Sequence, residues 1–354
     1  MTKAFIFALI LPFAAMAADD PAKTSDTSPS TQGDNSTQTK ENTAKTADKK
    51  TQSKDDKTKQ NSDKTAEDDA PIAVEPPQPA PIEERAKKDN GLVEQRANRE
   101  RDTAENPFVI TPHNPNYMLP VYYNRNIDRK SYADSLANNE SLDKVEFKFQ
   151  VSMKFPLAVK LFNGDNSLWV AYTQQSYWQA YNSGLSSPFR ESNYEPEIFL
   201  NFNISDDWYG IKPKYLRLGA IHQSNGRSDP YSRSWNRLYA DFIFESGNFV
   251  FNVKPWYRIP EDKEDDNNPD IEKYLGYGSV SGVYVMGNYS LNFLLRNNLR
   301  GSGNKGAVQL GFSFPLWGKL RGYVQYFNGY GESLIDYNHA TESLGLGIML
   351  TNWL

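Results

Sequence analysis

The sequence predicts an all-β fold, a transmembrane antiparallel up-and-down β-barrel of about twelve strands preceded by a disordered N-terminal segment. Two observations support this prediction. From about residue 108 onward, the chain repeats short segments in which apolar and polar side chains alternate. The N-terminus resembles an export signal, and no later stretch stays apolar for the roughly 18 residues that a membrane-spanning helix needs.

The export signal occupies residues 1–17. A basic start at residues 1–3 is followed by an apolar stretch at 4–14 and by the A-x-A cleavage pattern at 15–17. The alternative is a membrane anchor, but the apolar stretch is shorter than the roughly 20 residues that span a bilayer as a helix. The chain has no cysteine, which excludes a lipoprotein and leaves no disulfide framework.

Residues 18–105 are expected to form a disordered, low-complexity segment. They are rich in Thr, Ser, Lys, Asp and Gln, and no aromatic residue occurs between Asp19 and Pro107. Such a composition buries too little apolar surface to offset the entropy of ordering. Residues 82–105 could be transiently helical, although Asn90-Gly91 interrupts them. A solvated spacer is the favoured role, with docking to a cell wall or partner as the alternative.

Residues 106–354 are expected to form the barrel domain. One strand places Val145, Phe147, Phe149, Val151 and Met153 in alternation with Glu146, Lys148, Gln150 and Ser152. Similar segments lie near 168–179, 196–204, 213–224, 234–246, 248–258, 273–286, 288–298, 308–314, 318–330 and 343–352, and residues 121–126 complete twelve. Strands of this kind place lipid outside and polar side chains inside a closed barrel.

A soluble β-sandwich would also alternate, but the export signal and the aromatic content favour a membrane protein. The 21 Tyr and 7 Trp residues suit the aromatic girdles of a bilayer interface. One detail disagrees, since outer-membrane barrels usually end in an aromatic residue and this chain ends in Leu354. A net charge of -5 without a basic stripe argues against a nucleic-acid partner.

Two polar side chains interrupt an apolar strand face. The chain has three histidines, and His222 belongs to the strand that ends near Ser224. Leu216 and Leu218 mark one face of this strand, and counting on by two places His222 and Ser224 on the same face. In a membrane barrel that is the lipid face, where a polar side chain is costly unless it has a function.

Asn236 repeats this pattern on the next strand, because Leu238, Ala240 and Phe242 mark an outward face. Neighbouring strands would bring Ser, His and Asn together as a nucleophile, a general base and an orienting group for the imidazole. A neutral Asn suits this place, because an ionised Asp facing hydrocarbon would lose its hydration. The alternative is an interfacial polar cluster without catalysis.

The surrounding residues resemble a known family. The stretch HQSNGRSDPYSRSWNRLY (222–239) resembles the signature of the outer-membrane phospholipase A family. The resemblance extends to NPNYMLP (114–120), YTQQSYWQ (172–179), SSPFRESNYEPEIFL (186–200), VKPWY (253–257), NPDIEKYLGY (268–277) and GYGESLIDYN (329–338). It therefore covers nearly all of residues 106–354.

The resemblance implies a twelve-stranded barrel in the outer membrane of a Gram-negative bacterium. The implied activity is calcium-dependent hydrolysis of acyl esters in phospholipids and lysophospholipids, that is, phospholipase A1 and A2 activity. Ser224 would be the nucleophile and His222 the general base. Asn236 would orient His222, and the backbone N–H of Gly226 would help to form the oxyanion hole.

The resemblance also implies a calcium site that forms when two copies associate. The ligands would be the carbonyl of Arg227, the hydroxyl of Ser232 and the carbonyl of Ser186 from the second copy. Asp229 could serve a further calcium site, or it could be an ordinary solvated loop residue. A loop aspartate of the family corresponds to Asp266, with Asn267 as a competitor.

Dimerisation would control the activity, with an idle monomer and an active homodimer. Gln174, an amide on the outward face, matches a dimer-contact glutamine of the family.

The rival hypotheses are a passive pore and an inactive anchor. A pore needs an open lumen, yet the side chains predicted to point inward are large and polar. They are Arg217, Arg237, Tyr239, Asp241 and Glu245.

Overall fold

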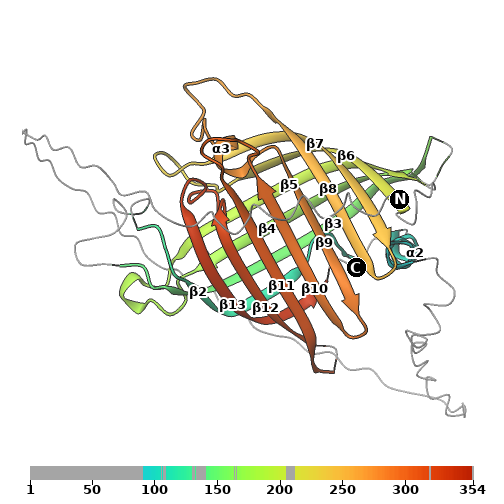
Figure 1. The fold of residues 1–354 in the computed structure, drawn as a ribbon, viewed down its shortest axis with the longest axis horizontal. Coiled ribbons are helices and arrows are strands. Elements are labelled where there is room, and N and C mark those ends of the chain that lie inside the picture. Colours follow the sequence, from blue (N-terminus) through green and yellow to red (C-terminus); the bar gives the residue numbers. More distant parts are fainter. Residues whose placement is uncertain are drawn as a thin grey trace, which may run out of the picture. The chain divides into compact units, whose positions relative to one another are not determined.

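A computed structural model describes residues 91–104, 106, 109–129, 132, 141–162, 164, 166–204, 212–318 and 320–352. The predicted signal peptide, the predicted segment as far as residue 90, and the C-terminal Leu354 lie outside the described residues. Figure 1 shows strands β2 to β13 winding around a common axis as a barrel.

Twelve antiparallel strands close this barrel, which confirms the predicted fold and strand number. Each strand from β2 onward pairs with the next, and β13 pairs with β2. The twelve are β2 (Asn116–Asn124), β3 (Val145–Leu161), β4 (Asn166–Trp178), β5 (Phe189–Asn203), β6 (Lys212–Ser224), β7 (Ser234–Ser246), β8 (Phe249–Ile259), β9 (Gly278–Met286), β10 (Tyr289–Asn297), β11 (Gly306–Trp317), β12 (Leu320–Tyr330) and β13 (Ala340–Thr351). The short β1 (Thr111–Pro112) pairs with β3 beyond the end of β2.

The barrel is polar inside and apolar outside. On β3, Lys148 is 1% exposed and faces the lumen, whereas Val151 is 37% exposed and faces outward. On β6 and β7 the leucines Leu218 and Leu238 are exposed, while Arg237 is buried. The alternation therefore separates the two faces of each strand as predicted, with the apolar side chains on the lipid side and the polar side chains in the lumen.

Ion pairs fill much of the lumen. Arg190 contacts both Glu146 and Asp336 at 2.6 Å, and Arg237 contacts Glu195 at 3.0 Å. Nearer the other end, Arg217 lies 3.8 Å from Asp241 and Lys214 lies 3.7 Å from Glu245. A cavity of about 320 Å³ remains among these groups. The five side chains predicted to point inward all belong to this buried interior.

The two ends of the barrel differ. At one end the strands are joined by tight turns, such as Gly247-Asn248 and Gly287-Asn288. At the other end the connections are longer, including residues 225–233, 260–277 and 331–339. Outer-membrane barrels carry short turns on the periplasmic side and long loops on the outer side. The long loops therefore mark the outer end.

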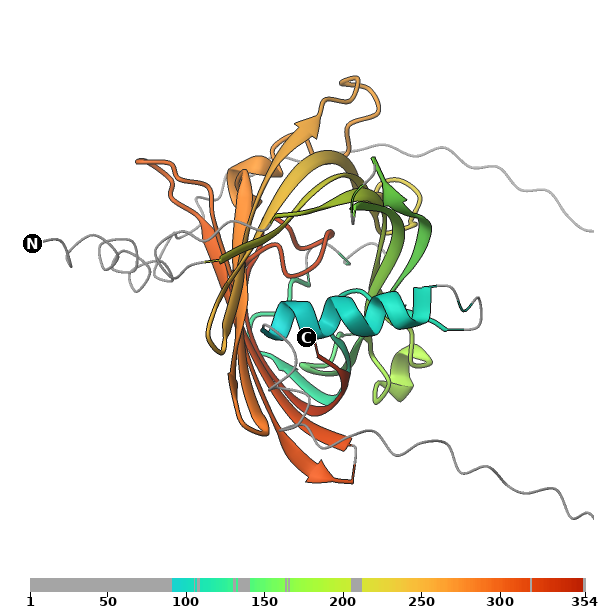
Figure 2. The ribbon, with the colours of Figure 1, turned by 90° about the vertical axis from the view of Figure 1, so that its right-hand side faces the viewer.

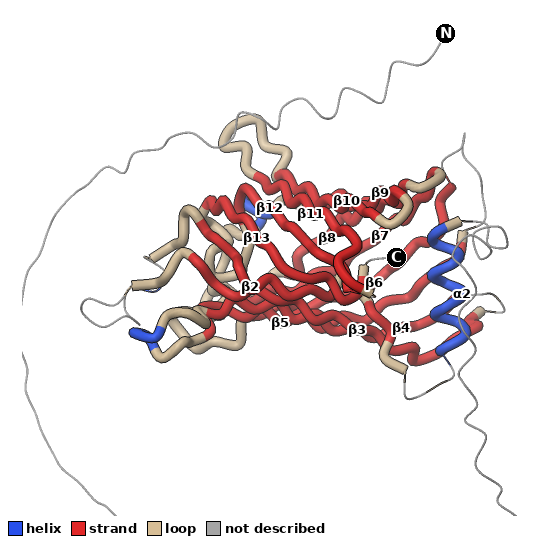
Figure 3. The backbone as a smooth tube through the Cα atoms, turned by 90° about the horizontal axis from the view of Figure 1, so that it is seen from below, coloured by secondary structure: helices blue, strands red, loops and turns tan. Residues whose placement is uncertain are grey.

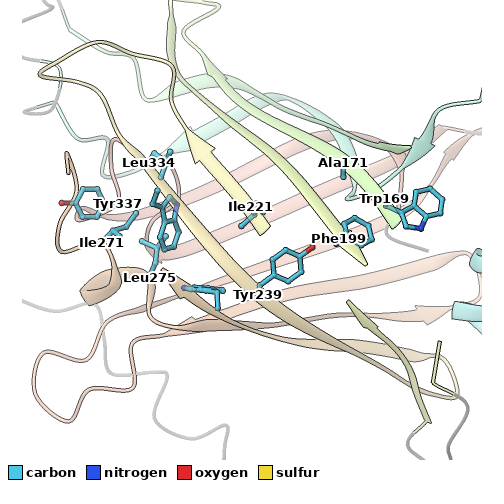
Figure 4. Close-up of a cluster of buried hydrophobic side chains, with 11 residues drawn as sticks. Trp169, Ala171, Phe199, Ile221, Tyr239, Ile271, Leu275, Leu334 and Tyr337 are labelled. Carbon is cyan, nitrogen blue, oxygen red and sulfur yellow. The ribbon is translucent and has the colours of Figure 1, made fainter. Parts of the chain in front are cut away.

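The long loops pack onto the lumen at the outer end. Ile271, Leu275 and Leu334 are buried together with Trp235 and Trp256. Figure 4 shows Ile271, Leu275 and Leu334 gathered at one end of this cluster, with Phe199 and Trp169 at the other. The indole N–H of Trp256 donates to the carbonyl of Gly276 at 3.1 Å, which ties the loop to the strand beneath it.

Several predicted strands have different bounds in the structure. The predicted strand 273–286 begins only at Gly278, because Ile271 and Leu275, four residues apart, bury one face of a helical turn that continues as α3 (Glu272–Leu275). β5 begins at Phe189, seven residues before the predicted 196. The alternation did not reveal this part of the strand, because its outward residues include Ser192 and Tyr194 rather than aliphatic side chains. A bulge in β2 breaks the alternation before the predicted 121–126.

Helix α2 (Leu92–Ala104) corrects the prediction of disorder for these thirteen residues. It lies across the short-turn end of the barrel, as Figures 2 and 3 show. Val93 is buried against Tyr215, Ile243 and Val250 from the strands. No helix in the described part of the chain is long and apolar enough to cross a membrane. The barrel unit therefore starts before residue 106.

Polar contacts fix α2 at several points. The backbone N–H of Leu92 donates to the carboxylate of Glu245, and Arg96 donates to the carbonyl of Pro112 at 2.8 Å. Glu100 pairs with Lys154 at 2.7 Å. Burial alone would raise the pKa of Glu100, but Lys154 and Arg96 outweigh burial and hold that pKa below its usual value of 4.5. The stabilisation that ionised Glu100 gives to the docked helix is therefore complete above pH 4.5. It is lost only as the pH falls through the lowered pKa of Glu100.

Replacing Glu100 with Ala is expected to weaken the docking of α2 by about 3 kcal/mol. The substitution leaves the ammonium of Lys154, which is 2% exposed, without its carboxylate. Tryptic cleavage at Arg99 and Arg101 in the refolded protein measures the release of the helix. Glu94→Ala is the control, because it removes a more exposed ion pair with Arg101. Equal cleavage of the two variants would contradict the prediction.

Candidate active site

Strand β6 carries His222 and Ser224 to the outer end of the barrel. Ser224 is its last residue, and both side chains lie on the outward face that Leu218 marks, as predicted. Gln223, between them, points inward and accepts hydrogen bonds from Trp235 at 2.8 Å and Arg237 at 3.1 Å. The lumen network therefore fixes the backbone from which the two outward side chains project.

Asn236 lies directly opposite His222 on β7. Its Oδ1 atom is 2.8 Å from Nδ1 of His222. An amide oxygen only accepts hydrogen bonds, so Nδ1 of the imidazole carries the proton and Nε2 is left as an acceptor. This is the tautomer that a general base needs. The cross-strand neighbourhood predicted from the sequence is confirmed.

Ser224 lies two residues from His222 and opposite Ser234. Among the described residues, the His222 ring hydrogen-bonds to Asn236 and not to the Ser224 hydroxyl. Catalytic hydrogen bonds are often long without substrate and tighten in the complex. Both side chains are half-buried on one face, and this leaves the hydroxyl and Nε2 accessible from the lipid side.

Gly226 follows Ser224 at the start of the loop 225–233. Its φ angle is +65°, a conformation that glycine adopts without strain. A Cβ atom at this position would lie 3.0 Å from the ring of Tyr194, which pairs with Ser224 across the sheet. The backbone thus adopts a left-handed conformation two residues after Ser224, and a side chain at this position would crowd Tyr194.

The side chain of Asn225 holds the rest of this loop. Its Oδ1 accepts from the backbone N–H of Arg227 at 3.3 Å and of Arg233 at 3.0 Å, and its Nδ2 donates to the carbonyl of Tyr231 at 2.8 Å. Among the described residues, no hydrogen bond reaches the carbonyl of Arg227 or the hydroxyl of Ser232, and both residues are half-buried. Asp229, at the tip, is exposed.

Three other predicted calcium ligands lie in two further connections at the outer end. Ser186 is exposed, with a φ angle of 56°, in the connection between β4 and β5. Asp266 accepts from Arg258 at 2.7 Å and from the backbone of Asn268 at 3.1 Å, whereas Asn267 is half-buried. Asn268 in turn accepts from the backbone N–H of Ser234 at 3.0 Å, which brings the loop beside the start of β7.

The oxygen atoms around the loop fit a hard cation. Within the described ranges, no three side chains of His, Cys, Asp or Glu gather as a metal site. A site here would instead use backbone carbonyl and hydroxyl oxygens, together with single carboxylates. Calcium accepts such mixed oxygen ligands in flexible geometry. The carbonyl oxygen of Arg227 and the hydroxyl oxygen of Ser232 therefore have the chemistry that the ion accepts.

Gln174 occupies the outward face of β4. Its Oε1 accepts from the hydroxyl of Tyr172 at 3.3 Å, and its Nε2 donates to Ser176 at 3.1 Å. Ser176 also hydrogen-bonds to Ser192 at 2.9 Å. The amide is thus satisfied within one barrel, although it lies on the face expected to contact lipid.

Sequence reasoning did not identify Glu261, whose Oε1 accepts a hydrogen bond from Nδ2 of Asn236 at 3.0 Å. Glu261 lies in an acidic loop, and its composition alone does not distinguish it from its neighbours. The end of β8 at Ile259 is the feature that could have identified Glu261. Ile259 pairs with Asn236, so a residue shortly after Ile259 lies near that amide.

The chain resembles known phospholipases. A sequence model described as phospholipase A1 matches residues 93–350. The phospholipase A1 proteins of Escherichia coli K12 and Salmonella typhimurium are each 41% identical over 249 residues, which cover 70% of this chain and 83% of each relative. The phospholipase A1 of Proteus vulgaris is 39% identical over 251 residues, or 70% of this chain and 83% of that protein.

Solved structures give the same result. The calcium-bound dimer of the Salmonella typhi outer membrane phospholipase matches with a TM-score of 0.66 and 39% identity. Outer membrane phospholipase A from Escherichia coli matches with a TM-score of 0.65 and 38% identity. Each match covers 71% of this chain and 95% of the other chain. Another structure of the Escherichia coli protein is described as an asparagine-to-alanine active-site mutant.

Proposed function

The chain belongs to the phospholipase A1 family, and from this premise we propose that it cleaves phospholipid acyl esters through Ser224, His222 and Asn236. Family membership makes it a phospholipid-hydrolysing enzyme of the outer membrane. The observation that carries the assignment of residues is the outward-facing His222–Asn236 hydrogen bond of 2.8 Å beside Ser224.

The chemistry follows from the tautomer of His222. Nε2 accepts the proton of Ser224 while Oγ attacks the acyl carbon, and the protonated imidazole then gives this proton to the departing glycerol oxygen. A water molecule, deprotonated by the same imidazole, releases the fatty acid from the acyl-serine. The N–H of Gly226 would stabilise the negative charge that develops on the carbonyl oxygen.

The outward placement of the site selects the substrate. A lipid in the outer leaflet presents its ester groups just inside the membrane boundary, beside the ends of the strands. Ser224 ends β6 at the long-loop end, so its hydroxyl lies at this boundary. A water-soluble ester has no such alignment with the barrel. Phospholipids and lysophospholipids, cleaved at either glycerol position, are the proposed substrates.

Calcium is the proposed cofactor, since a relative is a calcium-bound dimer and the local oxygens fit the ion. The carbonyl of Arg227 and the hydroxyl of Ser232 would hold it, with Ser186 of a second copy as a further ligand. When bound, calcium would polarise the ester carbonyl and support its negative charge. Arg227 itself is fixed by Glu191, 3.3 Å from its Nε, which keeps its carbonyl in place.

Asp229 and Asp266 are the proposed carboxylate ligands. Asp229 is exposed and free to turn toward a cation. Asp266 has one oxygen engaged by Arg258, and its second oxygen remains for the ion. Asn267, the competitor for the same role, offers a single neutral oxygen.

Dimerisation is the proposed control, and the active form is a homodimer. Gln174 finds both hydrogen-bond partners within its own barrel, so an idle monomer tolerates the amide in lipid. In a dimer the same amide can exchange these partners for the second copy. The second copy would also supply Ser186, which completes the calcium site only on association.

Hydrolysis and conductance together test the proposed function. The detergent-refolded chain is expected to release fatty acid from phospholipid in mixed micelles, because the ester faces Ser224 at the barrel rim. Planar bilayers are expected to show no stable channel, because the lumen contains the Arg190–Glu146 and Arg237–Glu195 pairs. Steady conductance without fatty-acid release from a folded dimer would favour a pore instead.

A further inference from the structure

Glu261 extends the hydrogen-bonded chain that starts at His222. Nδ1 of His222 lies 2.8 Å from Oδ1 of Asn236, and Nδ2 of the same amide lies 3.0 Å from Oε1 of Glu261. Each of the three side chains comes from a different place: β6, β7 and the loop after β8. The carboxylate therefore acts on the imidazole only through Asn236.

The register of the sheet explains why Glu261 reaches Asn236. Asn236 pairs with Ile259, the last residue of β8, and partners in a sheet share a face. Ile259 is exposed on the outward side, and Glu261 follows it by two residues. Two residues on, the side chain returns to the same face and comes within diagonal reach of Asn236.

The Glu261 carboxylate determines which way the side-chain amide of Asn236 is oriented. Asparagine can present either its oxygen or its NH₂ group to a neighbour. An ionised carboxylate only accepts hydrogen bonds, so Glu261 draws the NH₂ group toward itself and leaves Oδ1 for His222. A flipped amide would donate to Nδ1, and the imidazole would then carry its proton on Nε2. That form cannot take the proton of Ser224.

Glu261 also places a negative charge near the imidazolium that forms during attack. Asn236 is neutral and cannot supply it. A carboxylate in the position of Asn236 would face hydrocarbon, whereas Glu261 stands one side chain further out, half-buried in a loop of the outer end. The site thus receives a charge without burying it in lipid.

We propose that Glu261 is a positioning residue of this hydrolase, which fixes the amide of Asn236 and thereby the tautomer of His222. This inference rests on the proposed function. It predicts that loss of Glu261 lowers kcat without changing the apparent KM, because the contact of Glu261 is with Asn236 and not with a proposed substrate-binding group. It also predicts that the effect disappears when Asn236 is absent.

The first test compares steady-state hydrolysis by the full refolded chain with calcium present. Glu261→Ala is expected to lower kcat about tenfold, the size of one lost charge-assisted hydrogen bond. Glu261→Gln is expected to lie between this variant and the unmodified chain, since its amide can accept but can also donate. Glu264→Gln is the matched control, because it removes the same charge from an exposed position in the same loop.

A double-mutant cycle identifies the route of the effect. Adding Glu261→Ala to Asn236→Ala is expected to cause no further loss, because the amide that transmits the effect is gone. Equal fold losses in both backgrounds would overturn the inference. Ser224→Ala separates the two proposals: a dead Ser224 variant with a fully active Glu261 variant would reject the role of Glu261 and keep the proposed function.

The tautomer gives a direct readout. The chain has three histidines, so ¹⁵N-labelled histidine gives few signals, and the His222→Ala variant identifies the one from the site. The unmodified chain is expected to show a protonated Nδ1 on His222, and Glu261→Ala a mixture of both tautomers. An unchanged spectrum, or full recovery of kcat at high calcium, would overturn the inference in favour of a loop that merely holds the metal.

Discussion

Ser224→Ala is expected to abolish phospholipid hydrolysis while the barrel still folds. Removal of a catalytic nucleophile lowers kcat by roughly 10³-fold or more, because the remaining groups cannot form the acyl intermediate. Ser224 is half-buried on the outward face, and no ion pair of the lumen depends on it. Fatty-acid release from mixed micelles measures the loss, and the heat-dependent gel shift of the refolded barrel reports folding.

Ser234→Ala is the matched control for this substitution. Ser234 lies directly opposite Ser224 on β7 and loses the same hydroxyl. Its contact with Asn268 uses the backbone N–H, which the substitution keeps. Activity should therefore remain near that of the unmodified chain. Hydrolysis by Ser224→Ala at a comparable rate would reject Ser224 as the nucleophile.

Removal of calcium is expected to have the second largest effect and to reduce hydrolysis to background. The proposed ligands, the carbonyl of Arg227 and the hydroxyl of Ser232, lie in the loop that follows the nucleophile. Titration of calcium into chelator-treated enzyme measures recovery, and magnesium should not replace it, because magnesium demands a tighter octahedral site.

Single ligand variants refine this experiment. Ser232→Ala and Asp266→Asn are expected to raise the calcium concentration for half-maximal activity, whereas maximal activity returns at saturation. The control is Asp265→Asn, which removes a carboxylate from an exposed neighbour of Asp266. Full activity in the presence of chelator would contradict a calcium requirement and leave Ser224, His222 and Asn236 as the complete machinery.

Alternation along the strands allowed most of the barrel and the three central side chains to be predicted. Leu216 and Leu218 locate the outward face of β6, and Leu238 does the same for β7, so His222, Ser224 and Asn236 follow by counting. The pairing of His222 with Asn236 then needed only the assumption that consecutive strands are neighbours. Local pattern is sufficient wherever a strand stays regular.

Features that depend on distant contacts could not be predicted. Helix α2 has little apolar character, and its docking depends on Glu245 and Lys154 far along the chain. The bulge in β2 shifts the alternation by one residue and so conceals half of that strand. The position of Glu261 could not be predicted without the exact end of β8. If the strand ended one residue earlier, the side chains of the following loop would point to the opposite faces.

The contacts of α2 also determine the order in which the chain can assemble. The helix precedes every strand in the sequence, yet Leu92 bonds to Glu245, 153 residues later. Glu100 needs Lys154 on β3, and Val93 needs Val283 on β9. None of these partners is in place until the strands that carry them have assembled. Helix α2 therefore docks after those strands, although it is synthesised before them. A docked α2 is therefore a marker that β3 and the strands from β6 to β9 have assembled.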